Sequence, residues 1–155
     1  MLRLTRVTDY GILLMTQLVS EHESRRLTAN DLALATRVPA PTVSKILQSL
    51  LRSELLVSVR GAHGGYQLAR AASDISLRDI IHCLEGSIAL TECNLEGHDC
   101  EQSAFCSTSS HWKRINQSML EALGNISLAE MADEHFIPVF MVQRAIPIQN
   151  ISEAA

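Results

Sequence analysis

Three cysteines, Cys93, Cys100 and Cys106, lie close together in a polar stretch that reads as a loop. Six residues separate the first two and five separate the last two, so the tight pairs that usually begin a zinc knuckle are missing. Widely spaced thiolates can instead wrap an iron–sulfur cluster, whose iron atoms are met from several directions. The spacing alone leaves four interpretations open: a cluster, structural zinc, a redox thiol switch, or cysteines with no shared role.

A cluster held by three cysteines has one coordination position left for another kind of ligand. A weaker oxygen or nitrogen ligand makes a cluster easier to lose or oxidise, which suits a sensor. The fourth cysteine, Cys83, falls among apolar residues of a helical segment and is interpreted as a small core residue. An enzyme that uses Cys100 and His98 is disfavoured, because adjacent loop residues lack the buried, oriented base of nucleophilic catalysis. We therefore expect no enzymatic activity.

The composition predicts a helix-rich globular protein of the cytoplasm. The chain has 155 residues, of which 46% are hydrophobic and 4% aromatic, which fits an aliphatic core. We expect no membrane span, because no apolar run approaches the length that a bilayer requires. The first residues show no secretory signal, so a cytoplasmic location is expected, and there stable disulfides are rare.

The charge is divided unevenly along the chain. Residues 1–80 carry ten Lys and Arg against seven Asp and Glu, whereas residues 81–155 carry three against ten. The overall formal charge of −4 looks wrong for a nucleic-acid binder, but phosphate attraction depends on the local field at the contact face. The basic first half is therefore compatible with double-stranded DNA as a partner.

Two helices are predicted at the start of the chain. Residues 8–20 have the apolar spacing of a helix, with Thr8 expected as its N-cap. Residues 28–36 form a second, shorter helix, because Thr28 and Asp31 have the spacing of a capping box.

The next helix, residues 41–53, has two chemically distinct faces. It follows a short turn, and Pro41 suits its first position, where a missing N–H costs nothing. Five apolar side chains at helical spacing are expected to point inward: Val43, Ile46, Leu47, Leu50 and Leu51. The outward side chains carry hydrogen-bonding ends and only positive charge: Thr42, Ser44, Lys45, Gln48, Ser49 and Arg52. A short helix, a tight turn and this helix are typical of a helix-turn-helix.

A predicted hairpin then supplies the wing of a winged helix-turn-helix. Residues 56–59 and 66–68 alternate as strands, and the glycine-rich turn between them carries Arg60 and His63. Glycines let a backbone approach phosphate closely, and an arginine beside them can enter a minor groove.

We expect the DNA contacts to divide by chemistry. Base edges would be read by the outer face of the third helix, and the wing and other cations would contact phosphate or the minor groove. The candidate DNA-binding residues are Thr42, Ser44, Lys45, Gln48, Arg60, His63, Arg3 and Arg52.

The remaining segments predict an arm for oligomerisation. Residues 76–86 read as a helix with Ser76 and Asp79 as a capping box, and residues 127–133 as a short capped helix. Between them, residues 110–123 form a long helix. Its apolar positions have the spacing of a helix-pair seam, Trp112, Ile115, Met119 and Ala122, and we expect a homodimer.

The fold class expected is mainly α: a winged helix-turn-helix with a two-stranded wing and a C-terminal dimerisation helix. The expected parts are a DNA-binding domain at 1–86, a cysteine loop at 87–109, a dimerisation region at 110–133 and a tail at 134–155.

The chain to about residue 130 resembles the winged-helix iron–sulfur regulators of the IscR and NsrR type. The matching motifs are L-R-L-T-R-V-T-D-Y, V-P-A-P-T-V-S-K-I-L, V-R-G-A-H-G-G-Y and the loop with three cysteines. Within that group the opening residues look most like the regulators of the SUF iron–sulfur assembly operon. The resemblance implies that Cys93, Cys100 and Cys106 bind a 2Fe–2S or 4Fe–4S cluster that alters DNA affinity at promoters.

The chain departs from these relatives at several positions. Its first cysteine interval is one residue longer than usual, and Ser109 stands where some relatives have a histidine. Asp9 matches an aspartate that the nitric-oxide-sensing relatives contribute from the partner subunit, so it is the first candidate for the fourth ligand, ahead of His111 and His98. Asp9 could equally be a carboxylate in the first turn of the helix that the helix dipole stabilises. The relatives have a glutamate in place of Ser44, so the preferred DNA site is expected to differ.

Two other functions remain open. One is a winged-helix regulator that answers to zinc or thiol oxidation and holds no cluster. The other is an adaptor whose winged helix binds protein, with the acidic second half as the docking surface.

Overall fold

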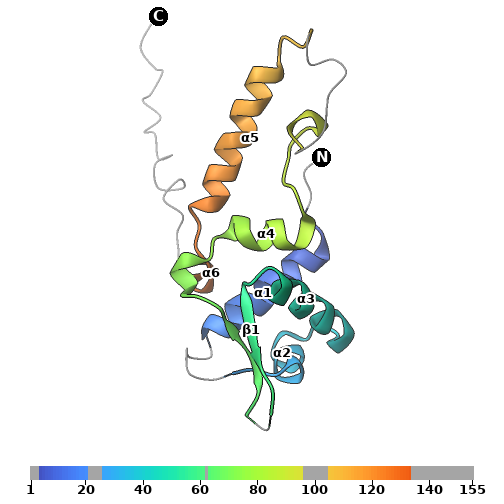
Figure 1. The fold of residues 1–155 in the computed structure, drawn as a ribbon, viewed down its shortest axis with the longest axis vertical. Coiled ribbons are helices and arrows are strands. Elements are labelled where there is room, and N and C mark those ends of the chain that lie inside the picture. The colour runs from blue at the N-terminus through green and yellow to red at the C-terminus, as the bar shows by residue number, and fades with distance from the viewer. Residues whose placement is uncertain (1–3, 21–25, 62, 96–104, 134–155) are drawn as a thin grey trace, which may run out of the picture.

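The computed structural model describes residues 4–20, 26–61, 63–95 and 105–133. Arg3, His98, Cys100 and the tail 134–155 lie outside these described residues. The elements in chain order are α1 (Arg6–Ser20), α2 (Ala29–Thr36), α3 (Ala40–Arg52), β1 (Leu56–Val59), β2 (Gly65–Leu68), the short 3-10 helix η1 (Ala72–Asp74), α4 (Leu77–Glu85), the 3-10 helix η2 (Glu92–Asn94), α5 (Ser109–Gly124) and α6 (Leu128–Ala132). Figure 1 shows an arm, formed by α5 and the segment with η2, rising away from a body formed by α1, α2, α3, α4, α6 and the hairpin.

The predicted fold class is confirmed, because a mainly helical chain carries a two-stranded antiparallel wing after a helix-turn-helix. Within the described residues, no helix has the length and apolar character needed to cross a membrane.

The core of the body is aliphatic and is built around α3. Four of the five side chains predicted to point inward are buried, and Leu51 is partly buried against the same core. They pack against α1, α2 and α4. Burial of one such side chain stabilises a protein by roughly 1.5–3 kcal/mol, so this face fixes the orientation of α3. The helix begins at Ala40, one residue earlier than predicted, and Pro41 occupies its second position.

Local side-chain caps start three of the helices. Thr28 with Asp31, Ser76 with Asp79, and Ser127 with Glu130 each form a complete capping box. In each box the hydroxyl accepts a backbone N–H and the carboxylate accepts another, which satisfies groups that a helix start leaves unpaired.

The first helix begins differently from the prediction. Thr8 is not its N-cap: α1 begins at Arg6, and Thr8 is completely buried within the first turn. The hydroxyl of Thr8 donates to the carboxylate of Glu85, at the end of α4. The same carboxylate accepts the backbone N–H of Thr5 at 2.8 Å. A side chain from another helix therefore caps the start of α1.

The hydrogen bond from Thr8 and that from the Thr5 backbone hold the pKa of Glu85 below its usual value. A lowered carboxylate pKa gives stability that is present above the unfolded value of 4.5 and is lost as pH falls through the folded pKa. We expect Glu85→Ala to lower the free energy of unfolding by about 1 kcal/mol at neutral pH, the typical cost of a lost cap. Urea unfolding at a series of pH values measures this.

The difference between Glu85→Ala and the unchanged protein should disappear in acid, below the folded pKa of Glu85. Glu121→Ala is the matched control, because Glu121 is an exposed carboxylate on α5 whose side chain, among the described residues, bonds only along its own helix, to Gln117 at 2.8 Å. Equal stability of Glu85→Ala and Glu121→Ala across the pH range would contradict the cap.

The wing is joined to the segment before α2. β1 and β2 pair antiparallel, with Leu56 opposite Leu68. Leu27 adds a bridge to Tyr66, with N–H···O distances of 3.2 and 2.8 Å in the two directions. β2 is therefore held by β1 on one side and by Leu27 on the other.

The last described helix returns to the body. Leu128 in α6 is completely buried, and α6 packs against α1. Two backbone hydrogen bonds attach the chain before α6 to the chain before α4: Leu77 N to Ile126 O at 2.8 Å and Leu128 N to Ile75 O at 2.7 Å. The expectation groups residues 127–133 with the dimerisation helix, whereas these contacts make them part of the body's core. The pattern missed this because Leu128 is buried by partners far away in the sequence.

Candidate nucleic-acid interface and thiol segment

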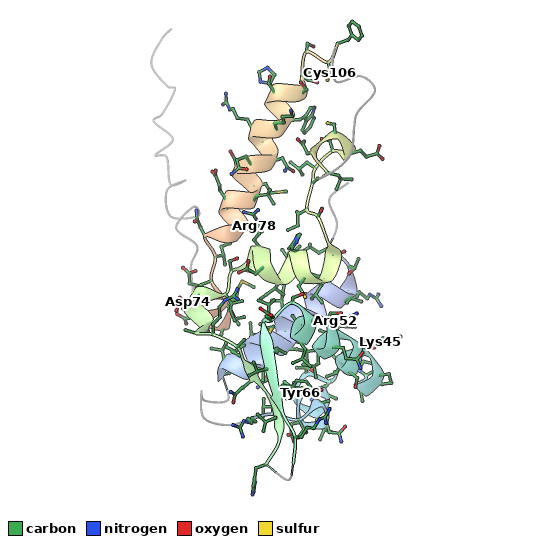
Figure 2. All side chains as sticks on the ribbon, in the orientation of Figure 1. Lys45, Arg52, Tyr66, Asp74, Arg78 and Cys106 are labelled. Carbon is green, nitrogen blue, oxygen red and sulfur yellow. The ribbon has the colours of Figure 1, made fainter. Side chains whose placement is uncertain are left out.

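The outward face of α3 is open to solvent. The side chains of Ser44, Lys45, Gln48 and Arg52 are exposed and that of Thr42 is half-buried. Lys45 and Arg52 are both labelled on α3 in Figure 2. The Ser44 hydroxyl donates to the carbonyl of Ala40 at 3.0 Å, which leaves its oxygen able to accept. This face can offer donors and acceptors to base edges; the contacts themselves stay a prediction.

Arg52 differs from the other polar residues of α3 in how it lies. Its Nε donates to the carbonyl of Gln48 and its Nη2 to the hydroxyl of Ser49, both at 3.4 Å. The guanidinium therefore lies back along the last turn of α3 rather than pointing straight outward. A cation in this position suits a phosphate beside the groove better than a base edge within it.

The wing presents its predicted side chains at an exposed turn. Arg60 and His63 are both exposed. Gly61 has a φ of +113°, a conformation that favours glycine. The N–H of Gly64 donates to the carbonyl of Gly61 at 2.9 Å and closes the turn. The turn therefore offers one cation and one imidazole in front of a tightly folded backbone.

A hollow of about 520 Å³ lies between the wing and the start of α2. Arg60, Gly61 and Gly64 line it from the wing, and Thr28 and Asn30 line it from α2. Thr28 and Asn30 were not among the sequence candidates. The capping box marked Thr28 as structural, and no local pattern brings α2 to the wing.

Arg26 is a further cation beside the wing that the sequence candidates omit. Its Nε donates to Oε1 of Gln67 in β2 at 3.1 Å. The bridge between Leu27 and Tyr66 places it there. The basic residue was visible in the sequence, but its neighbour on the wing is a long-range contact that spacing cannot supply.

Close packing makes Gly64 necessary for the wing. A Cβ atom at this position would lie 2.3 Å from the carbonyl oxygen of Val59. Because that oxygen belongs to backbone, Gly64→Ala must shift the strand, and we expect it to lower the free energy of unfolding by about 1–3 kcal/mol. Urea unfolding measures the change. At Gly124 a Cβ would meet only Arg78, at 3.9 Å, so Gly124→Ala is the control and should not destabilise. Equal effects of the two substitutions would rule out a packed wing turn.

The two described cysteines of the triad lie on segments that pack together. Cys93 is in η2 and is half-buried, and its Sγ lies 3.2 Å from the hydroxyl of Thr91. Cys106 precedes α5, and its Sγ lies 3.4 Å from the hydroxyl of Thr108. Because η2 packs against α5, both thiols belong to the arm that rises from the body (Figures 1 and 2).

Hydrogen bonding favours the thiolate of Cys106. The hydroxyl of Thr108, and then the backbone N–H groups of Thr108 and Ser109, hold the pKa of Cys106 below its usual value. A thiolate is the form of cysteine that binds metal and attacks oxidants. Cys93 and Cys106 are both free thiols. This donor chemistry fits an iron–sulfur cluster, for which thiolates are the usual ligands.

The candidate ligands do not gather within the described residues of one chain. No group of three His, Cys, Asp or Glu side chains there could hold a metal. Asp9 is exposed on α1 and His111 is exposed in the first turn of α5. The roles of Asp9 and His111 as ligands stay predictions. Cys83 is partly buried in α4 and packs against the core, as the sequence suggested.

One face of α5 lacks the cover that its apolar side chains would need. Trp112 is 40% exposed and Ile115 50% exposed, although both belong to the predicted seam. Asn116 is buried instead, and its Oδ1 accepts the N–H of Leu90, in the segment between α4 and η2, at 2.9 Å. The exposed seam is compatible with a second copy of the chain, and the dimer stays a prediction.

Comparison with known proteins identifies what the chain is similar to. Residues 4–134 match the model of the Rrf2 family, whose description is an iron-dependent transcriptional regulator. Protein rrf2 of Nitratidesulfovibrio vulgaris is 28% identical over 130 residues, which are 84% of this chain and 87% of that protein. The structure of CymR, the global cysteine regulator of B. subtilis, has a TM-score of 0.69 and 27% identity over 85% of this chain and 97% of that one. The structure of T. potens IscR has a TM-score of 0.66 and 30% identity over 91% and 96% of the two chains.

Proposed function

Because the chain belongs to the Rrf2 family of transcriptional regulators, we propose that it binds promoter DNA as a homodimer and that an iron–sulfur cluster controls this binding. As a regulator of this family the chain is not an enzyme. The observation that carries the proposal is the extent of the family match. Residues 4–134 include the outer face of α3, the wing and all three cysteines of the triad.

The DNA contacts follow from the exposed groups. α3 enters the major groove, where Ser44, Lys45 and Gln48 reach base edges, and Thr42 supports them at the start of the helix. Arg60 and His63 approach the minor groove or phosphate from the wing. Arg52 neutralises phosphate at the end of α3, and Arg3, outside the described residues, is a further candidate for phosphate.

The exposed seam of α5 pairs two chains and thereby spaces two recognition helices. Trp112 and Ile115 supply the apolar contact, and two copies of α3 then meet two half-sites of a symmetric DNA sequence.

The cluster would be held by Cys93, Cys100 and Cys106. Asp9 from the second subunit is the first choice for the remaining position, with His111 and His98 as alternatives. A bound cluster would be the chemically labile group, which a shortage of iron, an oxidant or nitric oxide can remove or alter. The chain's own part is to present thiolates: Thr91 and Thr108 lie beside two of the sulfurs, and the lowered pKa of Cys106 favours the metal-binding form.

Ligation would bias a two-state equilibrium of the arm. Ligation of one cluster by all three thiolates would restrain the segment between η2 and α5. A fourth ligand from the second subunit would also connect the arm to the other copy of α1. The distance between the two copies of α3 then changes, and with it the affinity for paired half-sites. Genes of iron–sulfur cluster assembly, including the SUF system, are the targets that such a signal suits.

A second candidate keeps the DNA contacts and replaces the cluster by thiol oxidation. The similarity to CymR, a cysteine regulator, and the thiolate character of Cys106 favour it. In this case Cys106 would react with an oxidant and no iron would be retained.

Anaerobic isolation of the full chain tests the proposal. We expect a coloured protein with stoichiometric iron and acid-labile sulfide, and Mössbauer spectra that identify a 2Fe–2S or a 4Fe–4S cluster. A colourless protein whose DNA affinity changes on oxidation would replace the proposal by the thiol switch. Absence of any salt-sensitive affinity for DNA would favour the protein-binding adaptor, because release of counterions makes both specific and non-specific DNA binding salt-dependent.

A further inference from the structure

A small pocket lies between the body and the arm, apart from the DNA-contact face and the two described cysteines of the triad. It has a volume of about 90 Å³, about three times the share of one water molecule in the liquid. Side chains from α4, η2 and α5 line it together with the chain after α4: Arg78, His82, Ser87, Ile88, Asn94, Asn116 and Leu120. Figure 2 shows Arg78 between α4 and the lower end of α5.

The lining is rich in hydrogen-bond donors and contains no carboxylate. Arg78 and His82 are four residues apart on α4, so they lie on the same face of the helix. A guanidinium offers five N–H groups and an imidazole offers at least one in either protonation state. No other side chain of the described residues forms a hydrogen bond or ion pair with Arg78 or His82. The pocket therefore concentrates free donors where nothing negative in its own lining balances them.

Asn116 adds a donor that is fixed in place. It is only 7% exposed, and its Oδ1 is already used by the N–H of Leu90 at 2.9 Å. This bond orients the amide, so its Nδ2 is the end that remains, and within the described chain that nitrogen has no hydrogen-bond partner. Among the described residues no completely buried side-chain nitrogen or oxygen lacks a partner, so Nδ2 is open to the pocket, where the oxygen of a bound anion can accept from it.

We propose that this pocket binds a small oxyanion, between the guanidinium of Arg78, the imidazole of His82 and the amide of Asn116. The volume admits a group of the size of phosphate, sulfate or a short carboxylate and excludes a nucleotide. Guanidinium groups bind such oxygens in pairs, and charge-assisted hydrogen bonds of this kind are the strongest that side chains form.

The position of the pocket would let a bound anion influence regulation. α4 packs against α1 and α3 of the body. On the other side of the pocket, η2 contains Cys93, and α5 begins three residues after Cys106. An anion that bridges these elements connects the thiol segment to the helices of the body. This connection to DNA affinity rests on the proposed function; the binding of the anion does not.

Titration of the full chain with sulfate, phosphate or acetate, without DNA, tests the site. Chloride at equal ionic strength is the reference. Two-dimensional NMR of the ¹⁵N-labelled protein follows the backbone amides of α4 and the side-chain amide of Asn116. We expect saturable shifts with a Kd on the order of 1 mM, the range for a ligand of so few atoms. Preference for sulfate and phosphate would identify a tetrahedral anion, and preference for acetate a carboxylate; either supports the site.

Arg78→Gln should weaken binding about tenfold, because it removes a charged donor, and His82→Gln should weaken it as well. Arg114→Gln removes the same charge from an exposed part of α5 that does not line the pocket, and should bind as the unchanged protein does. The thermal unfolding midpoint without anion checks that each variant folds. Shifts that match those of chloride, or Arg78→Gln binding as tightly as Arg114→Gln, would overturn the proposal. Neither outcome depends on whether the protein binds a cluster or DNA.

Discussion

Replacing Cys106 by alanine is expected to remove at least about nine-tenths of the iron that the anaerobically isolated protein carries. Changes in the groups that merely support a metal ligand already cost about 10- to 100-fold in affinity, and loss of a ligand costs no less. Cys106 is the described thiol whose hydrogen bonds favour the thiolate most clearly. Iron and sulfide per chain, with the visible spectrum, measure the loss. Cys93→Ala should behave alike.

The chain contains its own control for this experiment. Cys83→Ala also removes one of the four cysteines, but Cys83 lies in α4 and packs against the core. Its loss should lower stability slightly and leave the iron content unchanged. Full iron content in Cys106→Ala, or equal losses in Cys106→Ala and Cys83→Ala, would exclude the triad as the cluster site. A colourless unchanged protein that loses oxidant-sensitive DNA binding in Cys106→Ala would establish the thiol switch.

Arg60→Ala is expected to weaken binding to promoter DNA by about 5- to 150-fold. An arginine that reaches a base edge or a narrow minor groove contributes roughly 1–3 kcal/mol, and each 1.4 kcal/mol is a factor of ten. Arg60 is exposed at the wing tip and lines the hollow beside α2. Fluorescence anisotropy at several salt concentrations measures both the affinity and its salt dependence, whose slope should fall by about one.

Arg114→Ala is the matched control for the wing, because it removes an exposed arginine from α5. It should change the affinity less than Arg60→Ala does. If both variants bind promoter DNA as the unchanged protein does, the wing does not contact DNA. If neither protein nor variants show salt-sensitive binding, the adaptor interpretation becomes the better one.

Local signals predicted most of the elements. The capping boxes of α2 and α4 depend on two residues three positions apart, so Thr28 with Asp31 and Ser76 with Asp79 could be read directly. The inward face of α3 follows from apolar spacing alone. The spacing of the cysteines could not decide between a cluster, zinc and a redox thiol, because cysteine thiolates serve in all three kinds of site.

Contacts between distant residues account for what the sequence missed. The start of α1 depends on Glu85, which is 77 residues away from Thr8. Arg26 reaches the wing only through a bridge between segments that are 39 residues apart, at Leu27 and Tyr66. The anion pocket likewise combines Arg78 with Asn116, and neither residue is unusual within its own helix.

The return of the chain at Leu128 matters for anyone who wishes to divide the protein. A fragment that stops at residue 86 would lack Leu128 and the hydrogen bonds that residues 126–128 make with Ile75 and Leu77. Loss of one buried leucine side chain typically costs 2–5 kcal/mol, a large share of what holds a small domain together. Such a fragment would expose apolar surface of the core and aggregate. A variant in which a short artificial linker replaces the arm, and joins residue 86 to residues 126–132, should instead give a monomeric DNA-binding domain.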